Sequence, residues 1–384
     1  MKVTPAITLL FFLLVFSCQQ ERTRESVEEE EADFTSYTID IQAKSVEFTD
    51  QIASIELLGF EESSESLLKP NMLYLKYEGG YILVDENLGT VFFFNEDGTF
   101  KRKFNRKGGG PEEYRNMQHT RYRDGLIETY VYETQEMMQY NLSGNFIQAL
   151  DLPHQATDVI YFEKGYLLGM GNQFWLDSIN HDLVLTDNDM TPYAYALPFN
   201  KPEGVPVKPP SNDFRIDGNR VLFNPFWSDS VYQIKNDEVS PFIHFNFGED
   251  WLWKEFPMTR SLDGPTINAM TDMGKAWAYD WVLGTDRIYI TYMTSLNLPP
   301  SVGYIDRLTK EFHHYDFGWS QSGGLPFRAL RFEGDKLLVV FSTEVLGDFM
   351  GVIDREKTES IGKLSTDQIL ESENPVLAWI KFKK

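Results

Sequence analysis

The feature that most constrains the fold of this chain is a β-rich unit of about fifty residues that recurs six times. Each unit starts with a polar turn that contains glycine, and four or more strand-forming residues follow the turn. The marker glycines of these turns are Gly80, Gly125, Gly165, Gly218, Gly284 and Gly334, at spacings of 45, 40, 53, 66 and 50 residues. One unit of roughly four strands cannot bury both of its faces, whereas six units in a ring bury one another. The repeat therefore predicts an all-β protein, a six-bladed β-propeller over residues 37–384.

A second hairpin follows the start of most units, and one β-rich stretch precedes the first unit. In the first unit this hairpin covers Val91–Phe104, and in the sixth unit we expect it at residues 351–358. The preceding stretch consists of Tyr37–Ile41 and Val46–Leu58. We expect it to supply strands to the sixth blade, because a ring must close and this pairing locks the two chain ends together. The alternative architecture is a pair of β-sandwich domains, which does not predict six similar units.

Residues 1–17 have the features of a lipoprotein signal peptide. Lys2 is the only charge before the apolar run Ala6–Phe16, and this run is too short for a membrane-spanning helix, which needs about 20 residues. The run ends in Val15-Phe16-Ser17-Cys18, which resembles the lipobox of bacterial lipoproteins and contains the only cysteine of the chain. The resemblance implies that Cys18 carries acyl chains such as palmitate and anchors the protein to the outer-membrane bilayer. The alternative is an ordinary signal peptide followed by an unmodified cysteine.

Residues 18–36 contain almost no apolar side chains and include the acidic run Glu28–Glu31 followed by Asp33. Such a composition predicts a solvated, flexible tether between the lipidated cysteine and the propeller. The alternative is an acidic sorting signal for the cell surface. The sequence leaves both the periplasmic and the surface-exposed orientation open.

The charge balance restricts the classes of partner. The chain has 35 Lys and Arg residues against 58 Asp and Glu residues, so its formal net charge is −23. This charge argues against a nucleic-acid partner, which needs a basic footprint. A single cysteine excludes an intrachain disulfide and a multi-cysteine metal site. We predict no metal, no cofactor and a monomeric propeller.

The segment Phe104–Arg115 (FNRKGGGPEEYR) resembles a glycine-rich connection of the six-bladed β-propeller lipoproteins of Bacteroidetes-type bacteria. Asn224–Ile234, Phe245–Gly248 and Glu373–Leu377 also resemble segments of that family, so the likeness covers residues 37–384. Glu112 departs from it, because the family usually has a second glycine there. The resemblance implies a propeller fold and a location in the cell envelope. The activity of the family is largely unassigned, so the resemblance assigns no catalytic residue.

Two segments are candidates for a ligand-binding or partner-binding rim. One is the loop with Arg106, Lys107 and Tyr114, whose two cations stand out in an acidic chain; the alternative is a simple turn between blades. The other is an aromatic-rich insert near residues 249–283, which could stack on sugar rings or on a partner chain. Its candidate residues are Trp251, Trp253, Trp277 and Trp281. The alternative for the insert is a local core that caps the propeller.

These features predict a membrane-anchored envelope lipoprotein that binds a ligand or serves as a scaffold without catalysis. Glycan or polymer uptake or sensing is the context we expect, with an envelope protein or a glycan as partner. The alternative is a glycan-active hydrolase or lyase on a propeller scaffold. We favour the binding function because no catalytic motif is recognisable. For example, His313 and His314 are adjacent, so they point to opposite faces of a strand and cannot bind one metal together.

Overall fold

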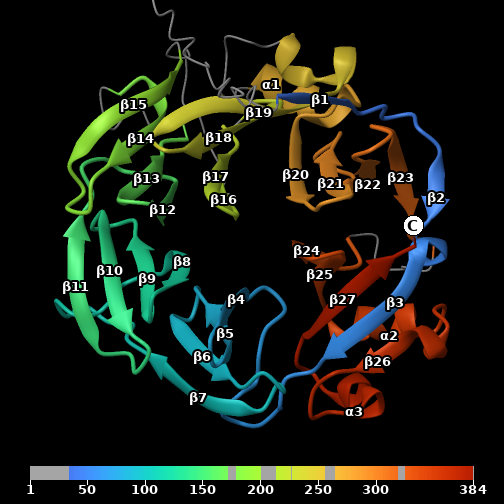
Figure 1. Ribbon diagram of the computed structural model, residues 1–384, viewed down its shortest axis with the longest axis horizontal. Coiled ribbons are helices and arrows are strands. Elements are labelled where there is room, and N and C mark those ends of the chain that lie inside the picture. The colour runs from blue at the N-terminus through green and yellow to red at the C-terminus, as the bar shows by residue number, and fades with distance from the viewer. Residues whose placement is uncertain are drawn as a thin grey trace, which may run out of the picture.

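The computed structural model describes residues 34–171, 179–199, 213–225, 227–255, 264–318 and 325–383. Six β-sheets follow one another around a central axis as the blades of a six-bladed propeller (Figure 1). The predicted fold is therefore confirmed. The predicted signal peptide, Cys18 and most of the acidic tether lie outside the described residues.

The first three blades each contain four antiparallel strands, and the first strand of each blade lies nearest the axis (Figure 1). Blade 1 contains β4 (Leu73–Tyr77), β5 (Gly80–Asp85), β6 (Thr90–Phe94) and β7 (Phe100–Asn105). Blade 2 contains β8 (Gln118–Arg123), β9 (Leu126–Val131), β10 (Glu136–Asn141) and β11 (Phe146–Asp151). Blade 3 contains β12 (Asp158–Phe162), β13 (Gly165–Gly169), β14 (His181–Thr186) and β15 (Pro192–Pro198).

Each of the other three blades contains five strands, one of which comes from the N-terminal stretch. Blade 4 contains β16 (Phe214–Asp217), β17 (Arg220–Phe223), β18 (Ser230–Lys235), β19 (Glu238–Asn246) and β1 (Thr35–Thr38). Blade 5 contains β20 (Ala278–Leu283), β21 (Arg287–Met293), β22 (Ser301–Asp306), β23 (Phe312–Asp316) and β2 (Ser45–Glu47). Blade 6 contains β24 (Arg328–Glu333), β25 (Lys336–Phe341), β27 (Val376–Phe382), β3 (Ile52–Leu58) and β26 (Thr358–Ser360).

The marker glycines lie where the first strand of each blade turns into the second. Gly80 shows why glycine is needed there. Its φ is +128°, and a Cβ atom at this position would lie 2.2 Å from the carbonyl oxygen of Phe94 on the neighbouring strand. The turn therefore brings two backbones so close that a side chain does not fit.

The ring closes in blade 6 as predicted for Ile52–Leu58. Strand β3 pairs antiparallel with the C-terminal strand β27, with Glu56 opposite Trp379. The earlier part of the N-terminal stretch differs from the prediction, because β1 pairs parallel with β19 in blade 4 and β2 pairs parallel with β23 in blade 5. These short strands cover outer edges that would otherwise be open to pairing with another chain. The N-terminal segment thus runs around the outside of the last three blades (Figure 1).

The sixth blade also differs from the prediction in its second half. Residues 351–358 do not form a hairpin, because β27 occupies the third position of the blade. The intervening chain forms two short helices, α2 (Thr343–Met350) and α3 (Thr366–Glu371). Ser342 and Ser365 accept hydrogen bonds from the first turns of these helices, which explains why the helices begin there.

Within the described residues, the hydrophobic core consists of six clusters, one between each pair of neighbouring blades. Between blades 5 and 6, for example, the fully buried ring of Phe48 contacts the rings of Phe349 and Phe382. Every blade therefore buries both of its faces against its neighbours, which is the physical reason for the ring.

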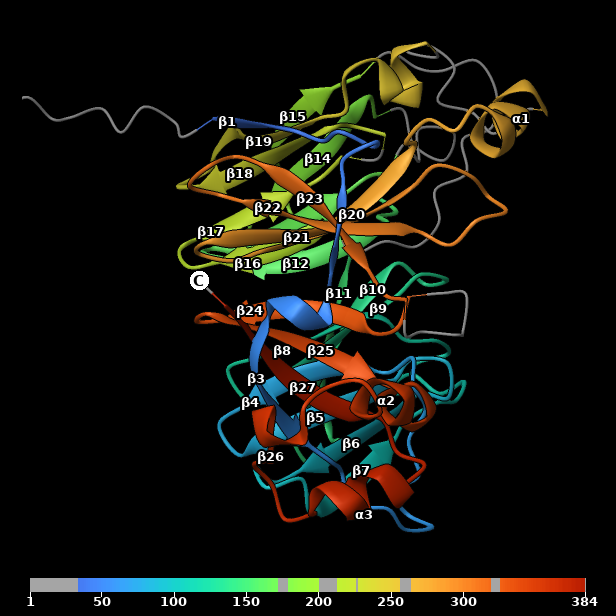
Figure 2. The same cartoon turned by 90° about the vertical axis from the view of Figure 1, so that its right-hand side faces the viewer.

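The antiparallel order gives the ring two different faces. The turns between first and second strands and between third and fourth strands lie on one face, which we call the turn face. The connections between blades lie on the other, the connection face, together with the helices α1 (Gly264–Asp272) and α2 (Figure 2). The described chain begins and ends on the turn face (Figure 2).

Candidate functional site

The loop with Arg106, Lys107 and Tyr114 connects blade 1 to blade 2 on the connection face. Tyr114 is fully buried; its hydroxyl donates a hydrogen bond to the carbonyl oxygen of Gly89 and accepts one from the Arg106 N–H, both at 2.8 Å. Burial raises the pKa of Tyr114 to about 12, so the hydroxyl stays protonated. Tyr114 therefore anchors the loop from inside and does not face a ligand.

The two cations of this loop are exposed, but each is held by a backbone carbonyl group. Arg106 Nε donates a hydrogen bond to the carbonyl oxygen of Gly144 at 2.7 Å, and Lys107 Nζ donates one to that of Asn87 at 2.7 Å. The carbonyl partners are neutral, and neither cation forms an ion pair with a residue that the structure describes. Arg106 and Lys107 thus remain accessible, while they also hold the loop to the adjoining turns.

The four candidate tryptophans are buried between blades 4 and 5. The exposed fractions of Trp251, Trp253, Trp277 and Trp281 are 4%, 6%, 7% and 1%. Trp253 Nε1 donates a hydrogen bond to the carbonyl oxygen of Trp277 at 2.7 Å, and its ring lies 4.6 Å from that of Trp227. An aromatic platform needs exposed ring faces, and the faces of these four rings are buried. The described part of the insert, residues 249–255 and 264–283, therefore forms a local core.

The two predicted segments lie on the same face of the ring but not next to each other. Both connect the outer strand of one blade to the inner strand of the next, so both belong to the connection face. One lies between blades 1 and 2 and the other between blades 4 and 5, on opposite sides of the axis (Figure 1). They do not form one shared rim.

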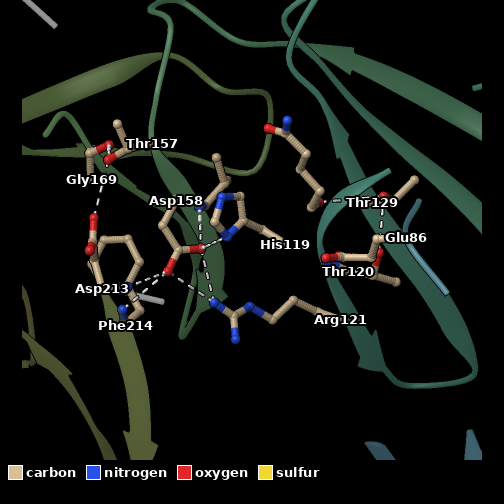
Figure 3. Close-up of polar contacts among 12 residues, drawn as sticks. Glu86, His119, Thr120, Arg121, Thr129, Thr157, Asp158, Gly169, Asp213 and Phe214 are labelled. Carbon is tan, nitrogen blue, oxygen red and sulfur yellow. Dashed lines mark hydrogen bonds and ion pairs between the residues drawn. The ribbon is translucent and has the colours of Figure 1, made fainter. Parts of the chain in front are cut away.

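A polar cluster that the sequence analysis did not identify lies on the inner strands of blades 2, 3 and 4 (Figure 3). Asp158 at the start of β12 is its centre and is completely buried. Its carboxylate accepts hydrogen bonds from the N–H groups of Asp213 and Phe214 at 2.9 and 3.1 Å, and from Arg121 Nη2 at 2.9 Å. His119 Nδ1 lies 3.2 Å from the same carboxylate. Asp158 therefore joins three blades.

The backbone of β8 is distorted so that His119 reaches this cluster. The φ of His119 is +49°, in the left-handed region, and the pairing of β8 with β9 shifts between Gln118 and Arg121. Such a bulge redirects a side chain at some cost in backbone energy. The contact with Asp158 offsets this cost.

The pKa values of Asp158 and His119 shift in opposite directions in the cluster. Burial alone would raise the pKa of Asp158, but Arg121 and His119 hold the pKa of this carboxyl well below its usual range. Burial alone would lower the pKa of His119, but the Asp158 carboxylate outweighs it and the pKa is raised. The group is therefore an ion pair shielded from water, because the His119 side chain is only 7% exposed. A substrate could not reach either residue without displacing the strands around them.

A second network ties blades 2 and 3 together in the same way. The buried Glu128 accepts hydrogen bonds from Arg123 Nη2 at 2.6 Å, from Gln139 Nε2 at 2.7 Å and from the Tyr166 hydroxyl at 2.9 Å. Burial in a low-dielectric interior makes such charge-assisted bonds strong. The partners of Glu128 come from three different strands, so this network also fixes the relative position of blades.

An open groove lies on the turn face of blades 4, 5 and 6 and has a volume of about 660 Å³. We call it the turn-face groove. Its lining comes from the turns 285–287 and 306–310 of blade 5, from Arg220, from Asp335, from residues 381–383 and from β1. The charged residues that line it are Arg220, Arg287, Arg307, Lys310, Lys381 and Lys383 against Asp286, Asp306 and Asp335. The groove is thus cationic, although the whole chain is strongly acidic.

Some charges of the groove are compensated and others are not. Lys381 Nζ pairs with Asp335 at 2.8 Å, and Arg220 pairs with Asp217 at 2.8 Å. Within the part of the chain that the structure describes, Lys310, Lys383 and Asp286 form no ion pair. The sequence signal for this site was present as basic residues in equivalent turns of successive repeats, but only the ring brings these turns together.

The described ranges lack two further features. No group of three or more potential metal ligands occurs among them. Likewise, none of the helices found between residues 34 and 383 is long and apolar enough to cross a membrane.

The family model of a domain of unknown function, DUF4934, matches residues 36–381. The chain belongs to the DUF4934 family. No curated protein has a significantly similar sequence. The DUF4934 chain resembles the crystal structure of a Bacteroides fragilis protein whose name marks it as exported, with a TM-score of 0.70 and 17% identity over 91% of this chain and 100% of the other.

Other solved structures are less similar to the DUF4934 chain. A DUF4221 protein from Bacteroides vulgatus has a TM-score of 0.46 and 12% identity, over 86% of this chain and 98% of the other. A streptogramin B lyase has a TM-score of 0.44 and 12% identity, over 85% and 98%. The likeness to the Bacteroides fragilis protein, at 17% identity, shows the propeller fold alone.

Proposed function

We propose that this DUF4934 protein is an envelope lipoprotein, anchored through acylated Cys18, whose propeller binds a ligand without catalysing a reaction. The observation that carries the proposal is the contrast between two polar regions. The ionisable groups of the Asp158 cluster form hydrogen bonds and ion pairs with one another between blades. The turn-face groove, in contrast, presents charged side chains without ion-pair partners in the described ranges to solvent. A polar surface with unpaired donors and acceptors suits recognition.

The location rests on the sequence of the N-terminal segment. Residues 1–17 have the pattern of a signal peptide, and Cys18 follows a lipobox-like segment. The likeness to an exported protein supports passage into the envelope. More than one acyl chain gives stable anchoring, at about 0.8 kcal/mol per buried CH₂.

Phase partitioning of the full-length protein tests the anchor. Wild type should enter the detergent phase of a cloud-point extraction, and Cys18→Ala should stay in the aqueous phase. Ser17→Ala serves as the control, because it keeps a small residue before the cysteine and should behave as wild type. Equal partitioning of wild type and Cys18→Ala would refute the anchor.

The alternative, a glycan-active hydrolase or lyase, needs an acid–base pair, and the described histidine–carboxylate pair near the axis, His119 and Asp158, could serve as one only if the strands around it opened. Incubation of wild type and His119→Asn with neutral and acidic oligosaccharides distinguishes the two functions. We expect no new reducing ends and no unsaturated products from either protein. Turnover by wild type that His119→Asn abolishes would establish the enzyme instead.

A further inference from the structure

We propose that the turn-face groove binds a sugar acid, a polyhydroxylated ligand that carries carboxylate groups. This inference deepens the proposed function, since it names the ligand class of the binding site. Three properties of the groove carry it: uncompensated cations, carboxylates placed between them, and a lining with few exposed rings.

The six cations of the groove come from three successive blades, and four of them, Arg287, Arg307, Lys310 and Lys383, form no ion pair within the described ranges. Arg307 Nη1 donates hydrogen bonds to the carbonyl oxygens of Gly284 and Thr285 at 2.7 and 3.1 Å, and Arg287 Nη2 donates one to that of Lys383 at 2.8 Å. Carbonyl groups hold these guanidinium groups in place but do not neutralise them. Arg307 Nε is buried without a hydrogen-bond partner among the described residues. Such preordered cations favour the carboxylates of a ligand.

The carboxylates of the groove argue against a ligand that is only an anion. Asp286 is exposed and has no ion-pair partner in the described ranges, and it lies next to Arg287. Asp306 lies beside Arg307 and uses its Oδ1 atom to accept the N–H groups of Leu308 and Thr309 at 2.9 Å. A carboxylate repels a phosphate or an acidic peptide but accepts hydrogen bonds from hydroxyl groups. Alternating cations and carboxylates therefore suit a ligand with both acidic and hydroxyl groups.

The volume and the apolar content of the turn-face groove also favour a small polar ligand. A volume of about 660 Å³ lies within the usual range of small-ligand sites, roughly 300–1,000 Å³. Of the aromatic residues that border the groove, Tyr37, Phe242 and Phe382 are buried and Phe332 is half-buried. Leu308 is the exposed apolar side chain of the lining, at 92%. A protein partner would need exposed aromatic anchors or apolar pockets at the centre of its interface. Apart from Leu308, the groove offers charged and polar groups and no exposed aromatic ring, so a short acidic oligosaccharide fits it better.

Calorimetric titration of the full-length, detergent-solubilised protein with trigalacturonate tests the proposal, with neutral galactotriose as the matched ligand. We expect saturable binding of trigalacturonate and none of galactotriose. The double variant Lys310→Glu/Lys383→Glu should raise the dissociation constant for trigalacturonate at least tenfold. Lys44→Glu/Lys363→Glu, at exposed positions outside the groove, makes the same change in net charge and should leave it within twofold.

A second variant separates recognition of a sugar acid from attraction by charge alone. Asp286→Ala makes the groove more cationic but removes an acceptor for hydroxyl groups. Binding of trigalacturonate should weaken at least threefold in this variant, while any weak binding of hexaglutamate should strengthen. If Asp286→Ala strengthens both, or if wild type binds hexaglutamate as tightly as trigalacturonate, the groove recognises charge only and the proposal is wrong.

Absence of trigalacturonate binding, or equal binding by the two double-lysine variants, would also refute this ligand assignment. Neither result affects the proposed function, because the anchor is measured by partitioning of Cys18→Ala and the lack of catalysis by product analysis. Conversely, turnover of trigalacturonate by wild type would refute the non-catalytic function even if the groove binds it.

Discussion

At the scale of single residues, the Asp158 cluster shows how one buried charge organises the inner part of the ring. Its carboxylate accepts hydrogen bonds from Arg121 and from backbone N–H groups at the start of blade 4, and it contacts His119. Removing one partner of a buried pair leaves an uncompensated charge, which costs about 3–5 kcal/mol. Asp158→Asn should lower the free energy of unfolding by this amount in urea titrations.

Glu249→Gln is the matched control for that change, because it also converts an acid to its amide. Glu249 pairs with Lys254 at 3.4 Å, but its side chain is 94% exposed. Exposed pairs contribute about 0–1 kcal/mol. If Asp158→Asn proved as mild as Glu249→Gln, the cluster would not hold the blades together.

The pKa shifts of the cluster predict a pH dependence of its contribution to stability. The pKa of His119 is raised in the folded state, so its contribution is complete below the unfolded value of about 6.5 and is lost as the pH rises through the folded value. The pKa of Asp158 is lowered, so its contribution is present above about 3.9 and is lost only in stronger acid.

The difference in melting temperature between wild type and His119→Asn should therefore be larger at pH 5.5 than at pH 9. Asn is a suitable replacement because it tolerates the left-handed backbone at this position. A difference that does not change with pH would mean that His119 stays neutral in the fold.

The sequence could not have revealed this cluster. Asp158 and Asp213 are far apart along the chain, and His119 occurs in no motif. The contact depends on a bulge in β8, which has no signature in the local residue types. By contrast, the glycine at position 80 was predictable, because its turn recurs in every unit.

At the scale of elements, the insert between blades 4 and 5 is a wedge of aromatic side chains. Trp253 packs on Trp227 and donates a hydrogen bond to Trp277. Truncation of a buried tryptophan typically costs 3–5 kcal/mol. Trp253→Ala should therefore melt well below wild type, whereas Tyr195→Ala at a ring that is 45% exposed should not. A near-native melting temperature of Trp253→Ala would contradict the structural function of the insert and favour a binding surface.

Composition alone could not decide between these two functions of the insert. Aromatic side chains serve equally well in a core and in a binding surface, and exposure distinguishes them only after folding. The strands were easier to predict from the sequence than the function of the insert, because alternating turns and strand-forming residues specify each blade locally. The exception is blade 6, where α2 and α3 replace the expected hairpin and β27 arrives from the far end of the chain.

At the scale of the whole molecule, stability depends on closure of the ring by β3 and β27. Ile55 at the middle of β3 is fully buried and pairs with Ile380. Ile55→Ala should cost about 2–5 kcal/mol, since it leaves a cavity in the cluster between blades 5 and 6. Because every blade needs both neighbours, tryptophan fluorescence and circular dichroism should report one common transition. Two separate transitions would show that blade 6 opens independently of the ring.

Closure was predictable in outline, because an unassigned β-rich stretch before the first unit must pair somewhere. The path of that stretch around blades 4 and 5 was not predictable, since parallel pairing at an outer edge imposes little on the residue pattern. The turn-face groove is a property of the whole ring as well. It collects charges from blades 4, 5 and 6, and its lining includes residues near both ends of the described chain.

Hydrogen–deuterium exchange of the full-length protein with and without trigalacturonate tests most directly the claim that the turn-face groove is the binding site. We expect slower exchange in the turns 285–287 and 306–310 and in the segment 381–383, with unchanged trigalacturonate at the end of the incubation. Protection in 104–115 or in the insert on the connection face, or consumption of the sugar, would contradict it.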